Sequence, residues 1–279
     1  MKRTTLLMSS SILVFVVSMG LSLTASAEEC KPKHQIKTIV PGTLTIVSQT
    51  FPPYDIPSAD GSLSGVEGDI LKSFAELECL KINTMVVDAS AAIQYLVTNR
   101  TDLAAASWFR TAERAKVVGI SDPLYLDQLG IYSKEGYSKI SELEGKRVGT
   151  IQGYNWVSDL QRTLGGNVKM YPNPVALAQD LAAGRVDIGV DSYGTGVYAQ
   201  RKGGYANLKI RVGEPDERVR ATVNSAQIGF LYQKGNDSLG TALNDYIAWI
   251  HKNGSMVSIF KEHGLDAKAA DPGPSRLIQ

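Results

Sequence analysis

The sequence of 279 residues contains 29 basic and 28 acidic side chains, which give a formal net charge of +1. It is 43% hydrophobic and 20% charged, a globular composition that excludes collagen, coiled coils and disordered chains. A charge near zero gives no support for binding nucleic acid or an anionic membrane through bulk electrostatics. The length allows one large domain or two smaller ones, each with its own hydrophobic core.

The first residues have the pattern of a secretory signal peptide. Two basic residues, Lys2 and Arg3, precede an apolar run from Leu6 to Leu23. A small-x-small cleavage site, Ala25-Ser26-Ala27, completes the pattern. The alternative is a membrane anchor, because the run is just long enough to span a bilayer. We expect cleavage after Ala27, which would remove residues 1–27 and export the mature protein.

The two cysteines, Cys30 and Cys79, both follow the predicted cleavage site. An even number of cysteines in an exported chain indicates a disulfide bond, so we expect a Cys30–Cys79 bridge. Two free, buried thiols are the alternative. We expect no metal site, because the three histidines, His34, His251 and His263, show no ligand spacing.

The first half of the chain alternates short apolar strands with amphipathic helices. From Asp69 onward, apolar residues recur on one helical face through Leu77. Thr111 has the hydroxyl of a helix N-cap just before a further helix. In chain order we expect a strand at 44–47, a helix at 69–77, a strand at 82–87, a helix at 91–97, a strand at 103–106 and a helix at 112–118.

A second series of strands and helices follows. We expect an extended segment at 129–132, a helical turn capped by Ser141, strands at 147–151, 168–171, 186–190 and 228–232, and helices at 156–164, 175–183, 195–201, 239–250 and 256–260. The residues from Ala267 onward are rich in proline, glycine and alanine, so we expect a flexible tail. Alternating strands and helices predict an α/β protein with largely parallel sheets, and two similar series predict two lobes.

The sequence lacks the common catalytic signatures. Gly194-Thr195-Gly196 has no third glycine with which to cradle a phosphate. Asp191-Ser192-Tyr193-Gly194 differs from a nucleophile elbow, because Val190 stands where the first glycine belongs. The three histidines lie near the two ends of the mature chain, which argues against a hydrolytic triad. We therefore expect a binding protein with no catalytic residue and no cofactor.

Seven short motifs occur in an order found in a known family. They are Phe51-Pro52-Pro53-Tyr54, Gly65-Val66-Glu67-Gly68-Asp69, Thr111-Ala112-Glu113-Arg114-Ala115-Lys116, Ser121-Asp122-Pro123-Leu124-Tyr125, Gly145-Lys146-Arg147-Val148-Gly149, Gly184-Arg185-Val186-Asp187 and Asn253-Gly254-Ser255. From about Gly42 to Leu265 the sequence thereby resembles the bacterial extracellular solute-binding proteins of family 3, the polar amino-acid type.

The resemblance implies a type II periplasmic-binding-protein-like fold, in which two α/β lobes close over a ligand and the chain crosses twice at the hinge. It implies a lobe 1 at 38–126 plus 226–265 and a lobe 2 at 127–225, which leaves residues 266–279 for the flexible tail expected from composition. The implied function is capture of a small carboxylate-bearing molecule (an amino acid, a derivative or an organic acid) in the periplasm. The implied partner is a membrane ABC permease, and the implied state is a monomer.

Three residues of lobe 1 match ligand-binding positions of the family. The resemblance implies that Arg114 grips a carboxylate, since a planar guanidinium makes two charge-assisted hydrogen bonds at once. It implies that Ser107 contacts the ligand through its backbone and hydroxyl, and that the ring of Phe51 covers the ligand side chain. A solvated Arg114 and a Phe51 within the core are the alternatives.

Neighbouring residues depart from the family pattern. Phe109 stands where relatives often carry a small hydroxyl residue, and Ala89 where many carry a second aromatic. Trp108 could supply the missing aromatic wall. Arg110 adds a cation beside Arg114, which favours a ligand with more than one anionic or acceptor group; a solvent-facing Arg110 is the alternative.

In lobe 2, Asn155 occupies the position of the family's carboxylate-binding threonine or serine, and it can both donate a hydrogen bond and cap a helix. The family's amino-group-binding aspartate corresponds to residue 192, a serine here, whereas Asp191 comes one place earlier. Strand alternation turns Asp191 to the other face unless the local backbone shifts. Glu67, Asp191 or Tyr193 could compensate, so the sequence leaves recognition of an amino group open.

Two other functions stay open. Some relatives on this fold are dehydratases of cyclic carboxylates such as prephenate or arogenate, and Glu67 and Asp191 are the candidates for the acid that such an enzyme needs. A sensory subunit that reports ligand occupancy to a membrane receptor is the other reading. The sequence does not separate that role from import.

Overall fold

The structure is a computed structural model that describes residues 30–279. The predicted signal peptide, residues 1–27, lies outside the described residues. Cys30 and Cys79 are the two cysteines of the sequence and both are disulfide-bonded, so the predicted bridge is confirmed. Residues 31–279 form one structural unit. Within the described residues, none of the helices has the length and hydropathy needed to cross a membrane.

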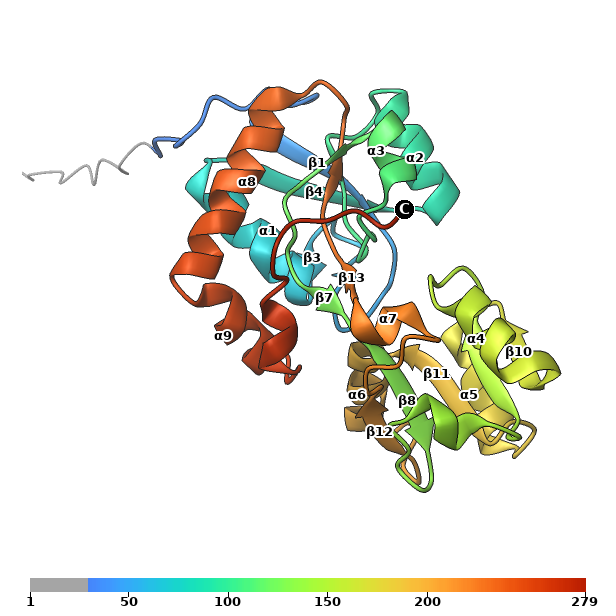
Figure 1. Ribbon diagram of the computed structural model, residues 1–279. Helices are drawn as coiled ribbons and strands as arrows, with labels where there is room; N and C mark the ends of the chain where they lie inside the picture. The colour runs from blue at the N-terminus through green and yellow to red at the C-terminus, as the bar shows by residue number, and fades with distance from the viewer. Residues whose placement is uncertain (1–29) are drawn as a thin grey trace, which may run out of the picture. The chain divides into compact units, whose positions relative to one another are not determined.

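The first sheet has five strands in the order β4-β1-β5-β14-β6. Figure 1 labels two of them, β1 and β4. Strand β1 (Thr43–Ser48) is parallel to both β4 (Lys81–Val86) and β5 (Leu103–Ala104). Strand β14 (Leu231–Tyr232) is antiparallel to β5 and to β6 (Gly119–Ile120). Because β14 comes late in the chain, this sheet unites an early and a late part of the sequence.

Five helices among the described residues, from the early and the late part of the sequence, belong to the same part of the fold as the first sheet. They are α1 (Val66–Leu77), α2 (Ala89–Val97), α3 (Ala112–Val117), α8 (Asp237–Lys252) and α9 (Ser255–Glu262). A short hairpin of β2 (Ile56–Pro57) and β3 (Leu63–Ser64) precedes α1. All the strands and helices predicted for the first half of the chain are therefore present, with ends shifted by a few residues.

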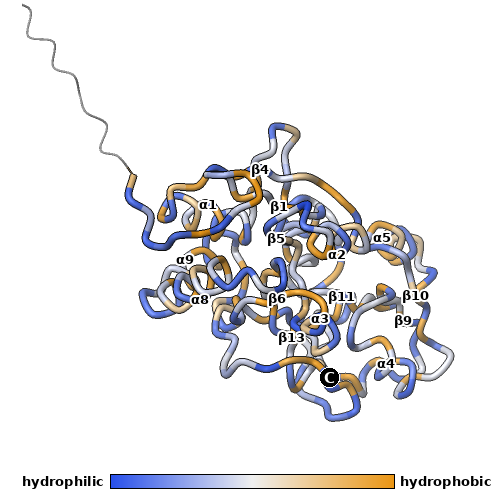
Figure 2. Tube along the Cα trace, turned by 90° about the horizontal axis from the view of Figure 1, so that it is seen from above, coloured by the Kyte–Doolittle hydropathy of each residue, from blue (hydrophilic) through white to orange (hydrophobic). Residues whose placement is uncertain are grey.

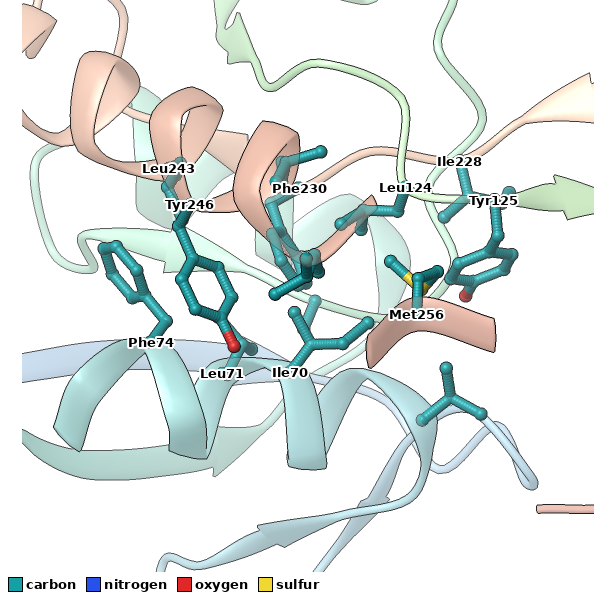
Figure 3. Packing of buried hydrophobic residues seen from close by; sticks show 14 of the residues in the cluster. Ile70, Leu71, Phe74, Leu124, Tyr125, Ile228, Phe230, Leu243, Tyr246 and Met256 are labelled. Atoms are coloured by element: carbon teal, nitrogen blue, oxygen red, sulfur yellow. The ribbon is translucent and has the colours of Figure 1, made fainter. Parts of the chain in front are cut away.

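The core of this part follows from side-chain periodicity. In β1, Leu44 and Ile46 belong to one buried cluster and Val47 to another, because successive side chains of a strand point to opposite faces. In α1, Phe74 is fully buried, and its ring meets the edge of Tyr246 of α8 at a centroid distance of 5.5 Å. Figure 3 shows this contact, with the α1 and α8 side chains facing each other.

The second sheet also has five strands, in the order β10-β9-β11-β8-β12. Strand β9 (Val148–Ile151) is parallel to β10 (Val168–Tyr171) and β11 (Ile188–Ser192), whereas β8 (Leu129–Ser133) is antiparallel to β11 and to β12 (Lys209–Val212). β12 is not predicted from the sequence, because it is four residues long and only two of them are apolar.

The helices of this second part alternate with its strands in the chain, and the last of them follows β12. They are α4 (Val157–Leu164), α5 (Pro174–Ala182), α6 (Tyr193–Arg201) and α7 (Arg220–Val223), with 3-10 turns η1 (Ile140–Leu143) and η2 (Gly165–Asn167). The prediction that Ser141 caps the turn η1 is wrong. The turn begins after Lys139, whose backbone N–H donates to the Glu142 carboxylate at 2.9 Å.

Two short antiparallel strands carry the chain between the sheets. β7 (Leu126–Asp127) comes after β6 and before β8, and β13 (Ala226–Gln227) comes after β12 and before β14. Their register pairs Ala226 with Asp127 and Gln227 with Leu126. The chain thus passes twice between the two sheets, as the predicted two-lobed topology requires.

Residues 266–279 differ from the expected flexible tail. They begin with the 3-10 turn η3 (Ala267–Ala270) and continue as an extended segment that ends beside α3 (Figure 1 and Figure 2). The side-chain amide of Gln227 donates to the carbonyls of Pro272 and Pro274, both at 2.8 Å. The expectation fails because composition alone does not show that these backbone carbonyls have a buried side-chain donor elsewhere in the chain.

Candidate functional site

The N-terminus of α3 positions the arginine predicted to bind a carboxylate. Thr111 is the N-cap, as predicted, and its hydroxyl accepts a hydrogen bond from the backbone N–H of Arg114 at 3.2 Å. The Arg114 guanidinium donates from Nη1 to the carbonyl of Phe109 at 2.6 Å, and its Cζ lies 4.9 Å from the ring centroid of Trp108. These contacts fix the orientation of the guanidinium and use only some of its five N–H donors.

Arg114 is a partly buried cation without an anion. Burial lowers the pKa of its guanidinium, and no carboxylate within residues 30–279 forms an ion pair with it. A desolvated charge is costly unless it is paired and hydrogen-bonded. The chemistry of this position therefore favours a ligand that carries a carboxylate.

Ser107 lies in a loop with a strained backbone. Ala106 and Ser107 have φ values of 142° and 51°, in a region that residues other than glycine rarely adopt. The Glu67 carboxylate accepts hydrogen bonds from the backbone N–H groups of both residues, each at 3.0 Å. The Ser107 hydroxyl lies 2.7 Å from the Tyr125 hydroxyl. Glu67 thus stabilises a strained loop of the kind that concentrates at binding sites.

The Glu67 carboxylate is buried and accepts three hydrogen bonds from other groups of the protein. Besides the two backbone N–H groups, the Tyr125 hydroxyl donates to it at 2.6 Å, and the residue is 1% exposed. Burial and the neighbouring Glu67 raise the pKa of Asp55 well above its ordinary value, and burial also raises the pKa of Glu67. The Glu67 carboxylate thus binds the backbone of Ser107 within the protein, at a residue for which the sequence predicts ligand contact or acid catalysis.

Arg110 uses its guanidinium to bind other parts of the protein. Nε donates to the carbonyl of Ser121 at 3.0 Å, and Nη1 donates to Gln227 Oε1 and to the carbonyl of Arg276, both at 2.8 Å. Nη2 donates to the hydroxyl of Ser275 at 2.9 Å. The second cation expected in the ligand site is therefore satisfied by protein acceptors, and it is buried rather than solvent-facing.

Phe51 begins a stack of three aromatic rings. It is partly buried, its ring lies 5.8 Å from that of Tyr54, and Tyr54 lies 5.1 Å from Tyr125, with nearly parallel planes. The Tyr54 hydroxyl lies against Gly194 in the first turn of α6, where a Cβ atom would overlap with it. Gly194 is thus required by a close approach between a loop next to the first sheet and a helix of the second.

The aromatic residues around Arg114 also reach residues of the second part. Phe109 lies 6.0 Å from Tyr154, which stacks on Trp156 at 4.2 Å. Trp108 is 5% exposed and offers its ring face to Arg114. Phe109, from the loop before α3, therefore lies beside an aromatic residue of the second part.

Asn155 and Tyr193, the residues expected from lobe 2, are both partly buried. Asn155 does not cap α4, because Trp156 occupies the N-cap position. The Oδ1 atom of Asn155 is buried and has no hydrogen-bond partner among the residues described. Tyr193 is the first residue of α6, and its backbone N–H donates to the carbonyl of Gln128 at 2.8 Å. The unpaired oxygen of Asn155 is a group that a ligand donor would satisfy.

Two buried aspartates flank Ser192 at the end of β11. The Ser192 hydroxyl donates to Asp127 Oδ1 at 2.6 Å, and its backbone N–H donates to Asp191 Oδ1 at 2.7 Å. Burial raises the pKa of Asp127 to about 7 and that of Asp191 to about 6. Sequence reasoning missed Asp127, although it lies at the predicted boundary between the lobes. Residues 30–279 contain no group of three or more side chains placed to hold a metal ion.

Known proteins resemble this chain over most of its length. The family model of bacterial extracellular solute-binding proteins, family 3, matches residues 44–266. The lysine/arginine/ornithine-binding periplasmic protein of Escherichia coli (strain K12) is 28% identical over 186 residues, which are 64% of this chain and 68% of the relative. The L-cystine-binding protein TcyJ of the same strain is 25% identical over 225 residues, 78% of this chain and 81% of the relative.

Solved structures give the same fold. An ancestral arginine-binding protein bound to glutamine matches with a TM-score of 0.64 and 27% identity, covering 81% of this chain and 100% of that protein. A substrate-binding protein of an ABC uptake transporter from Streptococcus pneumoniae, with bound histidine, matches with a TM-score of 0.65 and 18% identity, covering 82% and 94%. The predicted type II periplasmic-binding-protein fold is thereby confirmed. The chain belongs to the bacterial extracellular solute-binding proteins of family 3.

Proposed function

We propose that the protein captures a small carboxylate-bearing molecule, an amino acid or one of its derivatives, and delivers it to an ABC importer. The observation that carries this proposal is the partly buried Arg114 guanidinium, which has no anionic partner within the described residues. The names of matched relatives support this class of ligand, because those proteins bind lysine, arginine, ornithine or cystine. Each of these ligands has an α-carboxylate for such a guanidinium to bind.

The proposed site lies between lobe 1 (38–126 plus 226–265) and lobe 2 (127–225). The β7–β13 pair serves as the hinge, and a ligand that contacts both lobes shifts the population toward the closed state. Glu67 and Arg110 act as supports within lobe 1. Ligand contacts are proposed for Phe51, Ser107, Trp108 and Arg114 of lobe 1 and for Asn155, Asp191 and Tyr193 of lobe 2.

We also propose that the protein works in the periplasm as a monomer after cleavage following Ala27. The family of extracellular proteins and the periplasmic relative from Escherichia coli support this location. The proposed partner is a membrane ABC permease. Sensing is the alternative use of the same site, and neighbouring genes for permease subunits rather than for a receptor would favour import.

A thermal-shift screen tests the proposed ligand class. L-arginine, L-lysine, L-histidine, L-glutamine, L-cystine and simple organic acids are tested against the full chain, with agmatine, cadaverine and histamine as matched compounds that lack the carboxylate. A ligand at a hundredfold excess over its dissociation constant raises the free energy of unfolding by about 2.7 kcal/mol. We expect at least one carboxylate-bearing compound to stabilise the protein, and agmatine, cadaverine and histamine to have no effect. Stabilisation by none of the acids, or equal stabilisation by the decarboxylated compounds, would contradict the proposal.

We propose binding without turnover. The matched relatives named above are binding proteins, and Glu67, one of the candidate acids for a dehydratase, already accepts hydrogen bonds from two backbone N–H groups and from Tyr125. Incubation with prephenate or arogenate is expected to yield no phenylpyruvate or phenylalanine. Product formation above that of a heat-inactivated sample would contradict this part of the proposal.

A further inference from the structure

The C-terminal segment, residues 271–279, is held by two buried side chains next to the hinge. Gln227 of β13 donates to two carbonyls of the segment, and its Oε1 accepts the backbone N–H of Arg276 at 2.8 Å. Arg110 binds the carbonyl of Arg276 and the hydroxyl of Ser275. Arg110 and Gln227 are 6% and 1% exposed and are also bonded to each other. The segment is thus bound by a buried polar network, which makes its position specific.

The end of this segment pairs with the residues that lead into the Arg114 helix. The backbone N–H of Ile278 donates to the carbonyl of Arg110, and the N–H of Ala112 donates to the carbonyl of Ile278, both at 2.9 Å. These bonds form a parallel β-bridge between Ile278 and Thr111. In Figure 2 the C-terminal end lies beside α3.

The pairing supplies part of the N-terminal cap of α3. The first N–H groups of a helix have no partner within the helix and need acceptors from elsewhere. In α3, the Thr111 hydroxyl accepts the N–H of Arg114, and the Ile278 carbonyl accepts that of Ala112. The helix has only six residues, so its position depends on such external bonds rather than on its own length. The segment therefore fixes the start of the helix that carries Arg114.

The same end of the chain also borders the lobe 2 side of the site. A cavity of about 570 Å³ is lined by Asn155 and Asp159, by Arg220 of α7, and by Ile278 and Gln279 of the segment. Asn155 is the residue whose buried Oδ1 has no partner among the residues described. The segment is thus in contact with α3 on one side and lines a space shared with Asn155 on the other.

We propose that the C-terminal segment is a positioning element of the ligand site, in which the backbone of Ile278 holds the Arg114 helix in its binding geometry and Arg110 and Gln227 hold the segment. This inference rests on the proposed function in so far as Arg114 binds the ligand. It assigns a role to Arg110, since two of its four hydrogen bonds connect the loop before α3 to the segment, at Ser275 and Arg276, and a third joins it to Gln227. Arg110 and Gln227 act through Arg114 and do not themselves contact the ligand.

The test compares a truncation after Leu277 with the substitution Ile278→Ala. The truncation removes both backbone bonds to residues 110–112, whereas I278A removes a side chain and keeps those bonds. Hydrogen–deuterium exchange of residues 112–118 is measured without ligand. We expect at least tenfold faster exchange in the truncated protein and unchanged exchange in I278A, because only the truncation uncaps the helix.

Affinity is the second measurement. Isothermal titration uses whichever of L-arginine, L-lysine, L-histidine, L-glutamine and L-cystine stabilises the full chain. We expect the truncation to weaken binding by five- to thirtyfold and I278A to change it by less than twofold. The variant Ile247→Val lowers the melting temperature from within the core without touching α3, and it should leave both exchange and affinity unchanged. If the truncation acted only through a general loss of stability, exchange and affinity would change in the same way in I247V and in the truncated protein.

Each outcome decides the proposal. Unchanged exchange in the truncated protein, unchanged affinity despite faster exchange, or equal effects of I278A and the truncation would each overturn it. If none of the acids of the thermal-shift screen binds the full chain, the proposed ligand class fails. In that case, and where only an organic acid binds, exchange alone decides: faster exchange only in the truncated protein supports the positioning of α3, and unchanged exchange refutes it.

Discussion

Replacing Arg114 with alanine is expected to weaken binding of the amino acid that stabilises the wild-type protein by at least tenfold. The guanidinium is the partly buried cation of the site, and its loss would leave the ligand carboxylate desolvated without a partner. Isothermal titration of the wild type and R114A with the same amino acid measures the effect.

Arg114→Lys is the matched control, because it keeps the charge and loses the planar fork. Its affinity should fall between those of the wild type and R114A, since a lysine cannot make two parallel bonds to one carboxylate. The melting temperature without ligand should change little in either variant, because Arg114 makes one hydrogen bond to a carbonyl within the protein. An unchanged dissociation constant for R114A would show that the ligand binds elsewhere.

Asp127→Asn is expected to remove much of the decrease in stability between pH 5 and pH 8. Burial raises the pKa of Asp127 to about 7 in the folded protein, from 3.8 in a solvated chain. Between these values the folded state holds a proton that the unfolded state has released, so the free energy of unfolding falls as the pH rises toward 7. Over pH 5 to 8 this one group costs the wild type about 3 kcal/mol, at 1.36 kcal/mol per pH unit below the folded pKa.

Urea unfolding of the wild type and D127N at pH 5, 6, 7 and 8 measures this difference. The amide oxygen of the introduced asparagine can still accept the hydrogen bond that the Ser192 hydroxyl donates. A smaller slope should persist in D127N, because burial also raises the pKa of Asp191 to about 6. Glu217→Gln at an exposed position is the control and should keep the wild-type slope. An identical slope in D127N would show that Asp127 is ionised in the folded protein at every pH tested.

Local signals made several elements predictable from the sequence. The Thr111 hydroxyl stands one residue before α3 and caps it, as the sequence indicates. Ile70, Leu71 and Phe74 of the apolar stripe after Asp69 lie on the buried face of α1, whereas Leu77 at its end is exposed. Such features depend on residues within one or two turns of each other, so that spacing alone identifies them. The order of short motifs then predicted the family and the fold.

The roles of individual polar residues were less predictable, because they depend on partners far away in the chain. Arg110 and Arg114 are four residues apart, and both looked like possible ligand cations. Three of the four hydrogen-bond acceptors of Arg110 lie more than 100 residues away, in Gln227, Ser275 and Arg276, and two of these belong to the C-terminal segment. The proline-rich composition of that segment indicated disorder for the same reason, since it contains no trace of the donors that bind its carbonyls.

Asp127 illustrates another limit of the sequence. Its neighbours, Leu126 and Gln128, give no sign of unusual chemistry, and an aspartate near a turn is normally solvated. Its raised pKa follows from the three-dimensional arrangement, which buries it beside Ser192 of β11, sixty-five residues later in the chain. The predicted boundary between the lobes, which falls at this residue, was the feature of the sequence that pointed to a special position for Asp127.

The contact between Tyr54 and Gly194 leaves no space for a side chain at residue 194. Alanine is only one carbon atom larger than glycine, yet its methyl group would overlap with the Tyr54 hydroxyl and act as a wedge between the Phe51–Asp55 loop and α6. The loop follows a strand of the first sheet, and α6 follows a strand of the second. An added methyl group would therefore either increase the distance between the loop and α6 or distort the loop. The distance between the Phe51–Asp55 loop and α6 therefore depends on residue 194 having no side chain.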